Sequence, residues 1–471
     1  MTDSAPGHTT AREPEWVRHV VWWHVYPLGF SGADVTGADI TGADRSPSRG
    51  LAHVTAWLDY AVELGISGIA LGPIFQSSTH GYDTTDHFRI DPRLGPNRDF
   101  DELVAAVHNR GLRLLLDGVF NHVGRDFPAF RRALSRPGTE DVNWFHLKEP
   151  GNDAAYGPNF ATFEGHRDLV VLNHENPAVV DYVSEVMLYW LGQGADGWRL
   201  DAAYAVPLGF WREVLPRVRA VYPDAYFVGE VIHGDYSAII TESGLTSVTQ
   251  YELWKAIWSS LNDRNFFELA WALGRDNAYL DTFVPFTFIG NHDVTRLASK
   301  LVDDRHIALA LVILLTTGGT PSIYYGDEQA FRGVKEDRAG GDDAIRPAYP
   351  GGPADLAPDG WPTYRLHQDL TGLRRRHAWL HTARAHVVQL TNQQFVYSAV
   401  GRNARLIVAL NVADAASQHD LGGPAEVVAA SPGASADGAR LVVPAHGWVV
   451  ARPEYAQFDE KLGPNGGRAR G

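Results

Sequence analysis

Four apolar segments of this chain each end in a carboxylate residue, and their spacing restricts the possible folds to very few. The segments cover residues 113–117, 197–201, 226–230 and 286–293. Each is short and almost wholly apolar, as a parallel strand buried on both faces is. Asp201 and Glu230 lie 29 residues apart, about one strand–helix unit, and Asp293 follows about two units later. We therefore expect their side chains to meet at the carboxyl ends of one parallel sheet.

Amphipathic helices alternate with these and other apolar segments. Residues 53–64 form one example, with Val54, Trp57, Leu58 and Ala61 on one face. Further strands are expected at residues 20–26, 68–73, 112–119, 247–253 and 321–325. The alternation predicts an α/β protein with a TIM (β/α)8 barrel. A doubly wound open sheet is the alternative, and it is disfavoured because no glycine-rich phosphate loop follows the first strand.

The spacing also predicts domains outside the barrel. The interval from Asp117 to Asp201 is too long for one strand–helix unit, so a small domain is expected there. Beyond the helix expected at residues 364–376, short alternating segments predict a C-terminal antiparallel β-sandwich. These segments cover residues 385–390, 394–400, 405–411, 426–430, 440–443 and 447–452. The predicted division is an N-terminal extension (1–19), the barrel (20–122 and 171–377), the inserted domain (123–170), the β-sandwich (378–453) and a flexible tail (454–471).

Composition excludes several classes of function. The formal charge of −15 argues against a nucleic-acid partner, which needs clustered cationic side chains. The chain has no cysteine, so disulfides and thiolate metal sites are excluded. No apolar run reaches the roughly 18 residues of a membrane span, and no signal peptide is recognisable. We expect a cytoplasmic protein, and the sequence leaves its oligomeric state open.

Clustered carboxylates at a barrel mouth suit glycoside hydrolysis. That reaction needs a nucleophile or base on one side of the scissile bond and a general acid on the other. Crowding raises the pKa of one carboxyl group, so that it can hold a proton near neutral pH. A structural ion-pair network or a divalent-metal site uses the same residue types, and spacing alone does not assign roles.

Six motifs, in order along the chain, resemble those of the alpha-amylase family, glycoside hydrolase family 13. Four are its central regions: residues 117–122 (DGVFNH), 197–201 (GWRLD), 229–231 (GEV) and 288–293 (FIGNHD). Two flank them: residues 78–86 (STHGYDTTD) and 318–328 (GGTPSIYYGDE). The resemblance covers about residues 20–347. One such motif could arise by accident, but six in the family's order are specific.

This resemblance implies the catalytic roles. Asp201 would be the nucleophile that forms a covalent glycosyl-enzyme, and Glu230 the acid that protonates the leaving oxygen and then activates the acceptor. Asp293 would hold sugar hydroxyls and stabilise the distorted ring. Arg199, two residues before Asp201, would point to the same side of the strand and keep that carboxylate ionised. No cofactor is implied.

Three further residues are implied in substrate binding. His122 and His292 would donate hydrogen bonds to the same glucosyl unit, and Tyr82 would stack beneath it. The alternative for each histidine is an ordinary structural role. Asp117 is expected to organise the strand ends rather than to act chemically.

The sequence departs from the family's usual pattern at the calcium site, and the same segment indicates which branch of the family it resembles. Asn121 matches one ligand of the calcium site of many alpha-amylases, but Val171 stands where a carboxylate is usual, and Ala202–Ala205 offers no histidine after the nucleophile. Calcium prefers six to eight oxygens, so we predict no metal there. The segment around Val171 is similar to the neopullulanase and cyclodextrinase branch, whose N-terminal domain we expect to be absent.

The expected function is therefore a retaining glycosidase that cleaves α-1,4-glucosidic bonds of malto-oligosaccharides or short dextrins. The alternative is a transglycosylase or alpha-glucosidase acting on small α-glucosides such as sucrose, trehalose or isomaltose. A non-catalytic sugar-binding relative is a third class, disfavoured because all three carboxylates are present.

Overall fold

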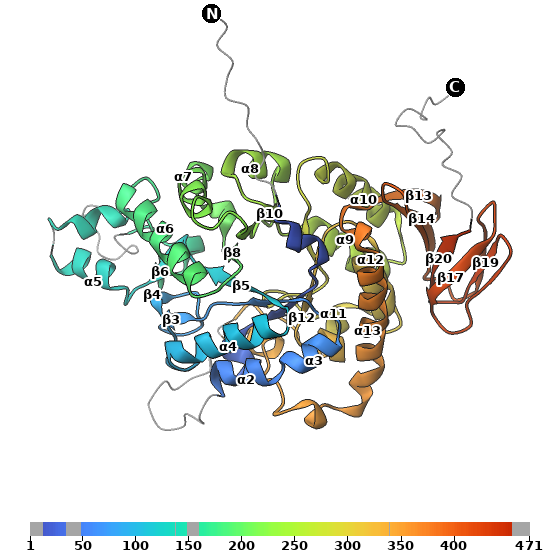
Figure 1. Ribbon diagram of the computed structural model, residues 1–471, viewed down its shortest axis with the longest axis horizontal. Coiled ribbons are helices and arrows are strands. Elements are labelled where there is room, and N and C mark those ends of the chain that lie inside the picture. Colours follow the sequence, from blue (N-terminus) through green and yellow to red (C-terminus); the bar gives the residue numbers. More distant parts are fainter. Residues whose placement is uncertain (1–12, 34–48, 137, 148–159, 339, 455–471) are drawn as a thin grey trace, which may run out of the picture.

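The computed structural model describes residues 13–33, 49–136, 138–147, 160–338 and 340–454. The barrel lies in the middle of an elongated molecule, with the C-terminal sheets at one end and the segment containing α5 at the other (Figure 1). The predicted tail, apart from Glu454, lies outside the described residues, as does most of the predicted N-terminal extension.

Among the described residues, eight parallel strands form the central sheet, in the order β10-β9-β8-β5-β2-β1-β12-β11. They are β1 (Trp22–Val25), β2 (Gly68–Leu71), β5 (Arg113–Gly118), β8 (Gly197–Leu200), β9 (Tyr226–Gly229), β10 (Ser247–Val248), β11 (Phe286–Phe288) and β12 (Thr320–Tyr324). A parallel bridge from Thr249 to Phe286 and a 2.9 Å hydrogen bond from the Gln250 amide to the Phe286 carbonyl join the two edges. The sheet is thus a nearly closed barrel, which confirms the prediction and excludes the open sheet.

Helices cover the outside of the barrel. The main ones are α2 (Gly50–Ala56), α3 (Leu58–Glu63), α4 (Asn97–Asn109), α6 (Pro177–Gly192), α7 (Leu208–Arg219), α8 (Tyr236–Ser243), α9 (Tyr251–Asn262), α10 (Phe267–Tyr279), α12 (His306–Thr316) and α13 (Trp361–Arg376). The sequence sets their ends: Asn176 caps α6, its side chain accepting a 2.9 Å hydrogen bond from the Ala178 amide, and Pro177 occupies the first helical position. The central α12 is buried along nearly its whole surface because it packs between the barrel and the C-terminal sheets.

A helix and a strand are among the predicted elements that are wrong in extent. The helix expected at residues 53–64 is broken at Trp57, whose indole donates to the Pro350 carbonyl (3.2 Å) and packs against Tyr349. The strand expected at residues 247–253 ends at Val248. Gln250 caps α9 instead, its side chain accepting a 3.4 Å hydrogen bond from the Leu253 amide. A side-chain cap thus starts a helix where the strand was expected to continue.

Short elements extend from the barrel rim. Between β5 and β8 lie β6 (His122–Gly124), α5 (Pro128–Ser135) and β7 (Leu169–Val171), and β6 pairs antiparallel with β7. Between β2 and α4, β3 (Phe75–Ser77) pairs antiparallel with β4 (Thr84–Ile90). The predicted boundaries of an inserted domain remain a prediction.

The C-terminal part is an antiparallel β-sandwich, as predicted. One sheet has the order β13-β14-β15-β20-β17 and the other β16-β19-β18. The strands are β13 (Arg384–Leu390), β14 (Gln394–Val400), β15 (Arg405–Asn411), β16 (Ser417–Asp420), β17 (Ala425–Ala430), β18 (Ser435–Asp437), β19 (Arg440–Val443) and β20 (Trp448–Pro453). β16 and β18 were not predicted.

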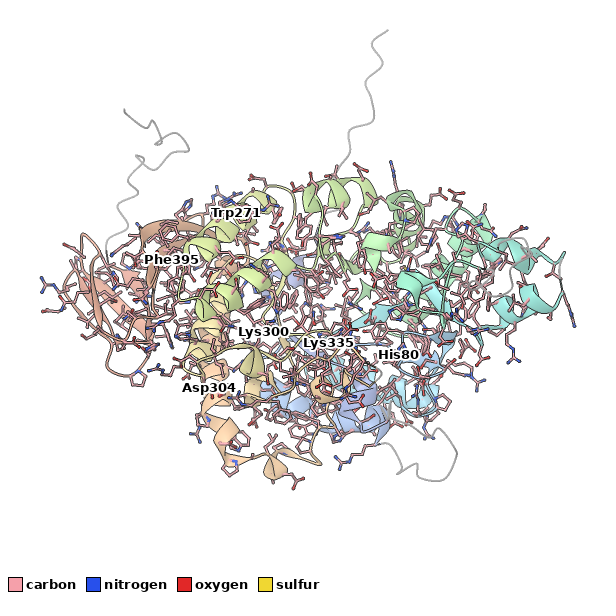
Figure 2. All side chains as sticks on the ribbon, turned by 180° about the vertical axis from the view of Figure 1, so that it is seen from behind. His80, Trp271, Lys300, Asp304, Lys335 and Phe395 are labelled. Carbon is pink, nitrogen blue, oxygen red and sulfur yellow. The ribbon has the colours of Figure 1, made fainter. Side chains whose placement is uncertain are left out.

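Successive side chains of the larger sheet point to opposite faces, so the sheet contributes to two apolar cores. Val396 and Ile407 face the smaller sheet. Phe395 and Tyr397 face the barrel helices, and Figure 2 labels Phe395 where the C-terminal sheet meets them. The Tyr397 hydroxyl also shares a 2.6 Å hydrogen bond with Thr316 at the end of α12. The barrel and the β-sandwich therefore share one apolar core.

Candidate active site

Two of the predicted carboxylates lie one residue beyond neighbouring barrel strands. Asp201 follows β8 and Glu230 follows β9, and the backbone pairing of the barrel continues through both. The Asp201 amide donates to the Gly118 carbonyl (3.0 Å), and the Glu230 amide donates to the Leu200 carbonyl (2.9 Å). The closed sheet therefore fixes the backbone of both residues.

The guanidinium of Arg199 lies at the centre of the site. Its Nη1 is 2.7 and 2.6 Å from the two oxygens of Asp117 and 3.1 Å from Oδ1 of Asp201. Its Nη2 is 2.7 Å from Oε1 of Glu230. All four side chains are largely buried. One cation thus joins three carboxylates, and such charge-assisted bonds are the strong ones.

A strained residue completes the surroundings of Glu230. Ala202 has a φ of +46°, a left-handed conformation that costs a residue with a Cβ about 1–2 kcal/mol. In this conformation its amide donates a 3.0 Å hydrogen bond to Oε2 of Glu230. Oε1 accepts from the Tyr251 hydroxyl at 3.3 Å, and Tyr251 in turn accepts from Asn291 (2.9 Å). Each oxygen of Glu230 therefore has a fixed donor.

Asp293 lies in a loop, not at the end of a strand as predicted. β11 ends at Phe288, and the Asp293 amide donates to the side chain of Asn291 (2.9 Å), which fixes the turn. The Asp293 carboxylate is 3.0 Å from Nε2 of His292 and 3.0 Å from Nη2 of Arg346. Its side chain is 31% exposed, more open than those of Asp201 and Glu230. Asp293 therefore offers an oxygen to the open side of the site.

Aromatic rings surround His292. The ring of Tyr82 lies parallel to it, with centroids 5.5 Å apart, and the ring of Tyr26 is also parallel, at 5.8 Å. The Tyr82 hydroxyl donates to Asp117 (3.2 Å) and is hydrogen-bonded to Nε2 of His292. Tyr82 thus links the loop between β3 and β4 to the carboxylate cluster.

His122 lies outside this network. Its ring stacks on Phe163 at 4.7 Å, and its Nδ1 accepts a 3.1 Å hydrogen bond from Asn121. Its Nε2 is buried and has no hydrogen-bond partner among the described residues. Burial lowers the pKa of His122 to about 3, so the ring is neutral and a proton on Nε2 is available to a ligand.

Burial and charge act in opposite directions on the carboxylates. Burial raises the pKa of Asp201 well above its usual range, opposed by Arg199 and reinforced by Glu230 and Asp117. Burial would also raise the pKa of Asp293, but His292, Arg346 and Arg199 outweigh it and hold that pKa well below its usual range. The site therefore has one carboxyl group that gains protons easily and one that stays ionised.

The residues at the expected calcium position fit a cation poorly. The Asn121 amide nitrogen is directed to His122, and Val171 offers only an apolar side chain. The carbonyl of Phe120 accepts a 3.0 Å hydrogen bond from His174. Within the described ranges, the one cluster of three histidine or acidic ligand atoms lies elsewhere. The absence of calcium remains a prediction.

The structure brings together Asp201, Glu230, Asp293, Arg199, His292 and Tyr82, and places His122 at the edge. Sequence reasoning did not identify Arg346, Tyr251 or Ala202 as parts of the site. Arg346 belongs to no motif, although its second partner, Asp342 (2.9 Å), lies in an acidic, glycine-rich run. Tyr251 was expected in a strand, and nothing in the sequence marks the backbone strain at Ala202.

Comparisons with known proteins agree with this geometry. The family model for the alpha-amylase catalytic domain matches residues 24–386. The maltogenic alpha-amylase of Bacillus acidopullulyticus is 33% identical over 344 residues, 69% of this chain and 58% of that protein. The cyclomaltodextrinase of Geobacillus thermopakistaniensis is 33% identical over 341 residues, 68% and 57% of the two chains. The chain thus spans less than two thirds of the length of these relatives.

A solved structure matches over nearly the whole chain. The cyclic alpha-maltosyl-(1→6)-maltose hydrolase from Arthrobacter globiformis has a TM-score of 0.80 at 26% identity, covering 94% of this chain and 100% of that one. No helix among the described residues is long and apolar enough to cross a membrane.

Proposed function

The chain belongs to the alpha-amylase family of hydrolases, and from this premise we propose that it is a retaining glycosidase acting on α-1,4-glucosidic bonds of malto-oligosaccharides or short dextrins. The observation that carries the proposal is the bridge formed by Arg199 between Asp201 and Glu230. It holds two carboxyl groups on adjacent strands at the barrel mouth, one for each side of a scissile bond.

Asp201 is the nucleophile in this proposal. Its carboxylate attacks the anomeric carbon, the bond to the leaving oxygen breaks, and Glu230 gives its proton to that oxygen. In the second step Glu230 takes a proton from water, which attacks the anomeric carbon and releases Asp201. Arg199 stabilises the ionised form of Asp201 between turnovers, and Asp117 orients Arg199 through both of its oxygens.

Asp293 and its neighbours bind the sugar. Asp293 stays ionised, so it accepts hydrogen bonds from ring hydroxyls, and these strengthen as the ring gains positive charge. The parallel rings of Tyr82 and His292 form one wall of the site, and His122 supplies a donor from its edge. Arg346 positions Asp293 rather than touching the reacting atoms.

Two kinds of support favour malto-oligosaccharides over other sugars. The relatives named above are a maltogenic amylase and a cyclomaltodextrinase, and the structural match is a hydrolase of a cyclic maltosyl sugar. The half-buried Phe163 and Tyr204 lie near each other (6.4 Å) beside His122 and Glu230, where apolar sugar faces would pack.

Product analysis tests the proposal. The purified chain is incubated with maltose, maltotriose, cyclodextrin, isomaltose, sucrose and trehalose, with Asp201→Asn as control. We expect cleavage of the malto-oligosaccharides with retention at the anomeric carbon, and loss of cleavage in the control. Activity on another disaccharide alone, or products longer than the substrate, would establish the transglycosylase or alpha-glucosidase alternative.

A further inference from the structure

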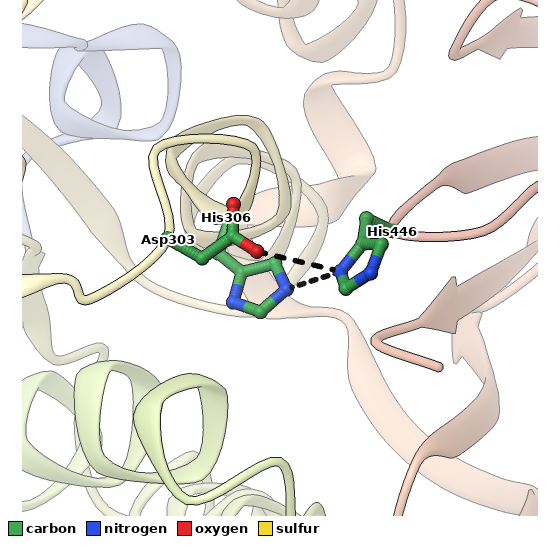
Figure 3. Close-up of side chains that lie close together, drawn as sticks. All are labelled: Asp303, His306 and His446. Atoms are coloured by element: carbon green, nitrogen blue, oxygen red, sulfur yellow. Dashed lines mark hydrogen bonds and ion pairs between the residues drawn. The ribbon is translucent and has the colours of Figure 1, made fainter. Parts of the chain in front are cut away.

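Three metal-ligating side chains meet where the barrel joins the β-sandwich, far in sequence from the catalytic motifs. His306 is the first residue of α12, Asp303 lies three residues before it, and His446 lies in the turn between β19 and β20 (Figure 3). Nε2 of His306 is 3.0 Å from Nδ1 of His446, and Oδ2 of Asp303 is 3.7 Å from that same Nδ1. One ligand atom from each of the three residues thus lies within 4.8 Å of the other two.

A fourth residue fixes the tautomer of His446. Its Nε2 is 2.8 Å from Oδ1 of Asp414, so Nε2 carries the proton and Nδ1 presents a lone pair to His306 and Asp303. Histidines that bind metals typically donate their other ring N–H to a carboxylate in this way, which orients the ring and raises its basicity. Asp414 therefore prepares His446 as a ligand.

His306 and His446 are buried, with 2% and 7% of their surfaces exposed. Because Nδ1 of His446 is an acceptor, Nε2 of His306 donates the hydrogen bond between the two rings. Nδ1 of His306 has no hydrogen-bond partner among the described residues, so no contact there opposes a shift of the proton from Nε2 to Nδ1 when a metal binds. The ring can therefore carry its proton on Nδ1 and release Nε2 as a second ligand.

From this geometry we propose that Asp303, His306 and His446 form a binding site for a divalent transition metal of the zinc class. Two histidine nitrogens and one carboxylate oxygen, with water as the fourth ligand, are a common zinc set. Bonds of about 2.0–2.1 Å at the tetrahedral angle separate neighbouring ligand atoms by roughly 3.3 Å. The two separations from Nδ1 of His446, 3.0 and 3.7 Å, bracket that value, and all three ligand atoms lie within 4.8 Å of one another. Side-chain movements of about 1 Å would therefore bring the three atoms to the bonding distance of one ion.

Arg305 is the main competitor for the site. It binds both oxygens of Asp303, at 2.9 Å from Nε and 2.6 Å from Nη2, and is largely exposed. A bound metal must share Asp303 with this guanidinium, so we expect micromolar rather than picomolar affinity. Calcium and magnesium prefer oxygen ligands and should not compete.

The site would fasten the β-sandwich to the barrel. Its ligands come from both parts, whereas the catalytic carboxylates all belong to the barrel rim. Metal binding should therefore raise the unfolding temperature of the whole chain without being required for sugar hydrolysis.

Calorimetric titration of the full chain with ZnCl2 tests the proposal, together with the visible spectrum after Co2+ addition. We expect one site of micromolar affinity, tetrahedral Co2+ absorption, and a higher Tm with Zn2+. His306→Gln and His446→Gln should each weaken this affinity at least 10-fold. The matched control is His419→Gln, a buried histidine of the β-sandwich bonded to Ser417 and Gln389 instead.

A substitution at an exposed residue controls for misfolding of the histidine variants. Asp414→Asn removes the carboxylate behind His446, together with its exposed ion pair to Arg264 (3.0 Å), and should weaken Zn2+ binding 10–100-fold in a normally folded chain. Equal Zn2+ affinity in the wild type and in the double variant H306Q/H446Q would overturn the proposal, since the ion would then bind elsewhere. So would a wild-type affinity weaker than millimolar, or an octahedral Co2+ spectrum.

Discussion

At the scale of single residues, the charge around Arg199 determines how the site responds to pH. Three carboxylates share one guanidinium, so negative charge is in excess and one carboxyl group holds its proton more readily than a free one. Burial, Glu230 and Asp117 raise the pKa of Asp201. Because Asp201, as the proposed nucleophile, must be ionised to react, catalysis should weaken as the pH falls through this raised pKa.

The first prediction concerns Asp117. Replacing Asp117 by asparagine removes a negative charge beside Asp201. It also removes the carboxylate that competes with Asp201 for the guanidinium of Arg199, and both effects lower the pKa of Asp201. In Asp117→Asn we expect the acidic limb of the kcat/KM profile to move to lower pH, whatever the loss in absolute rate. The profile of kcat/KM from pH 3 to 8 measures this, and a limb that stays in place or moves upward would contradict the assignment.

The second prediction separates the acid from the nucleophile. Glu230→Gln should lower kcat on maltotriose by about 10²–10⁴-fold, because the sugar leaving group needs a proton. Fluoride leaves without one, so α-maltosyl fluoride should still give a rapid burst of about one fluoride per active site. Stopped-flow fluoride release checks this. Asp201→Asn should give no burst, and a burst there would reverse the two roles.

The structure brings most of the motif residues together as the sequence predicts, while their catalytic roles, which the family resemblance implies, remain predictions. Asp201, Glu230 and Arg199 were predicted because they sit at or next to strand ends, whose position follows from apolar segments of regular spacing. Arg346 and Tyr251 reach the site from a loop and a helix start, and their contacts span 53 and 21 residues. Local pattern carries no information about such long-range contacts.

At the scale of elements, the junction of β10 and α9 depends on a buried acid. Asp276 of α10 is 2% exposed and accepts a 2.9 Å hydrogen bond from the side chain of Gln250, the cap of α9. Burial raises the pKa of Asp276 to about 7. The folded chain therefore holds this proton more tightly than the unfolded chain does.

The third prediction follows from the sign of that shift. Protonated Asp276 contributes up to about 4 kcal/mol to the free energy of unfolding. This contribution is complete below about pH 4 and is lost as the pH rises through about 7. Asp276→Asn imitates the neutral acid, so its unfolding free energy should fall less between pH 5 and 8 than that of the wild type. Urea unfolding at both pH values measures this, with Asp101→Asn at an exposed position as control. The prediction would be contradicted if the unfolding free energies of Asp276→Asn and the wild type changed equally between the two pH values.

Element prediction succeeded where hydrophobic periodicity was strong. Strands β14 and β15 have the bounds expected from their alternating pattern. β16 and β18 are short and largely polar (SQHD and SAD), so their pairing with β19 leaves no period to recognise. The break at Trp57 and the cap at Gln250 depend on single side-chain bonds, which a periodicity argument cannot weigh against a continuous element.

At the scale of the whole molecule, the shared core joins the β-sandwich to the barrel. Phe395 is fully buried and lies 5.8 Å from Phe266, in the connection between α9 and α10. Aromatic side chains contribute strongly to such cores. The two parts should therefore unfold together and not as separate modules.

The fourth prediction tests that coupling. Phe395→Ala should destabilise the chain by about 3–5 kcal/mol and lower the temperature of a single unfolding transition. Val387→Ala, at a half-exposed position of β13, should cost far less. Scanning calorimetry distinguishes the outcomes: a variant in which an early, small transition separates from an unchanged main one would show that the β-sandwich unfolds independently.

The short β10 gives the barrel unequal stiffness around its circumference. β8 and β9 are paired over four residues, so Asp201 and Glu230 are carried on one rigid unit. On the other side of β10, the edge that leads to Asp293 is joined through one bridge and one hydrogen bond. The barrel is therefore least constrained by backbone pairing at this point, and we expect its rim to deform there most easily. Asp201 and Glu230 would keep their spacing, while the loop that carries Asp293 adjusts to glycans of different width.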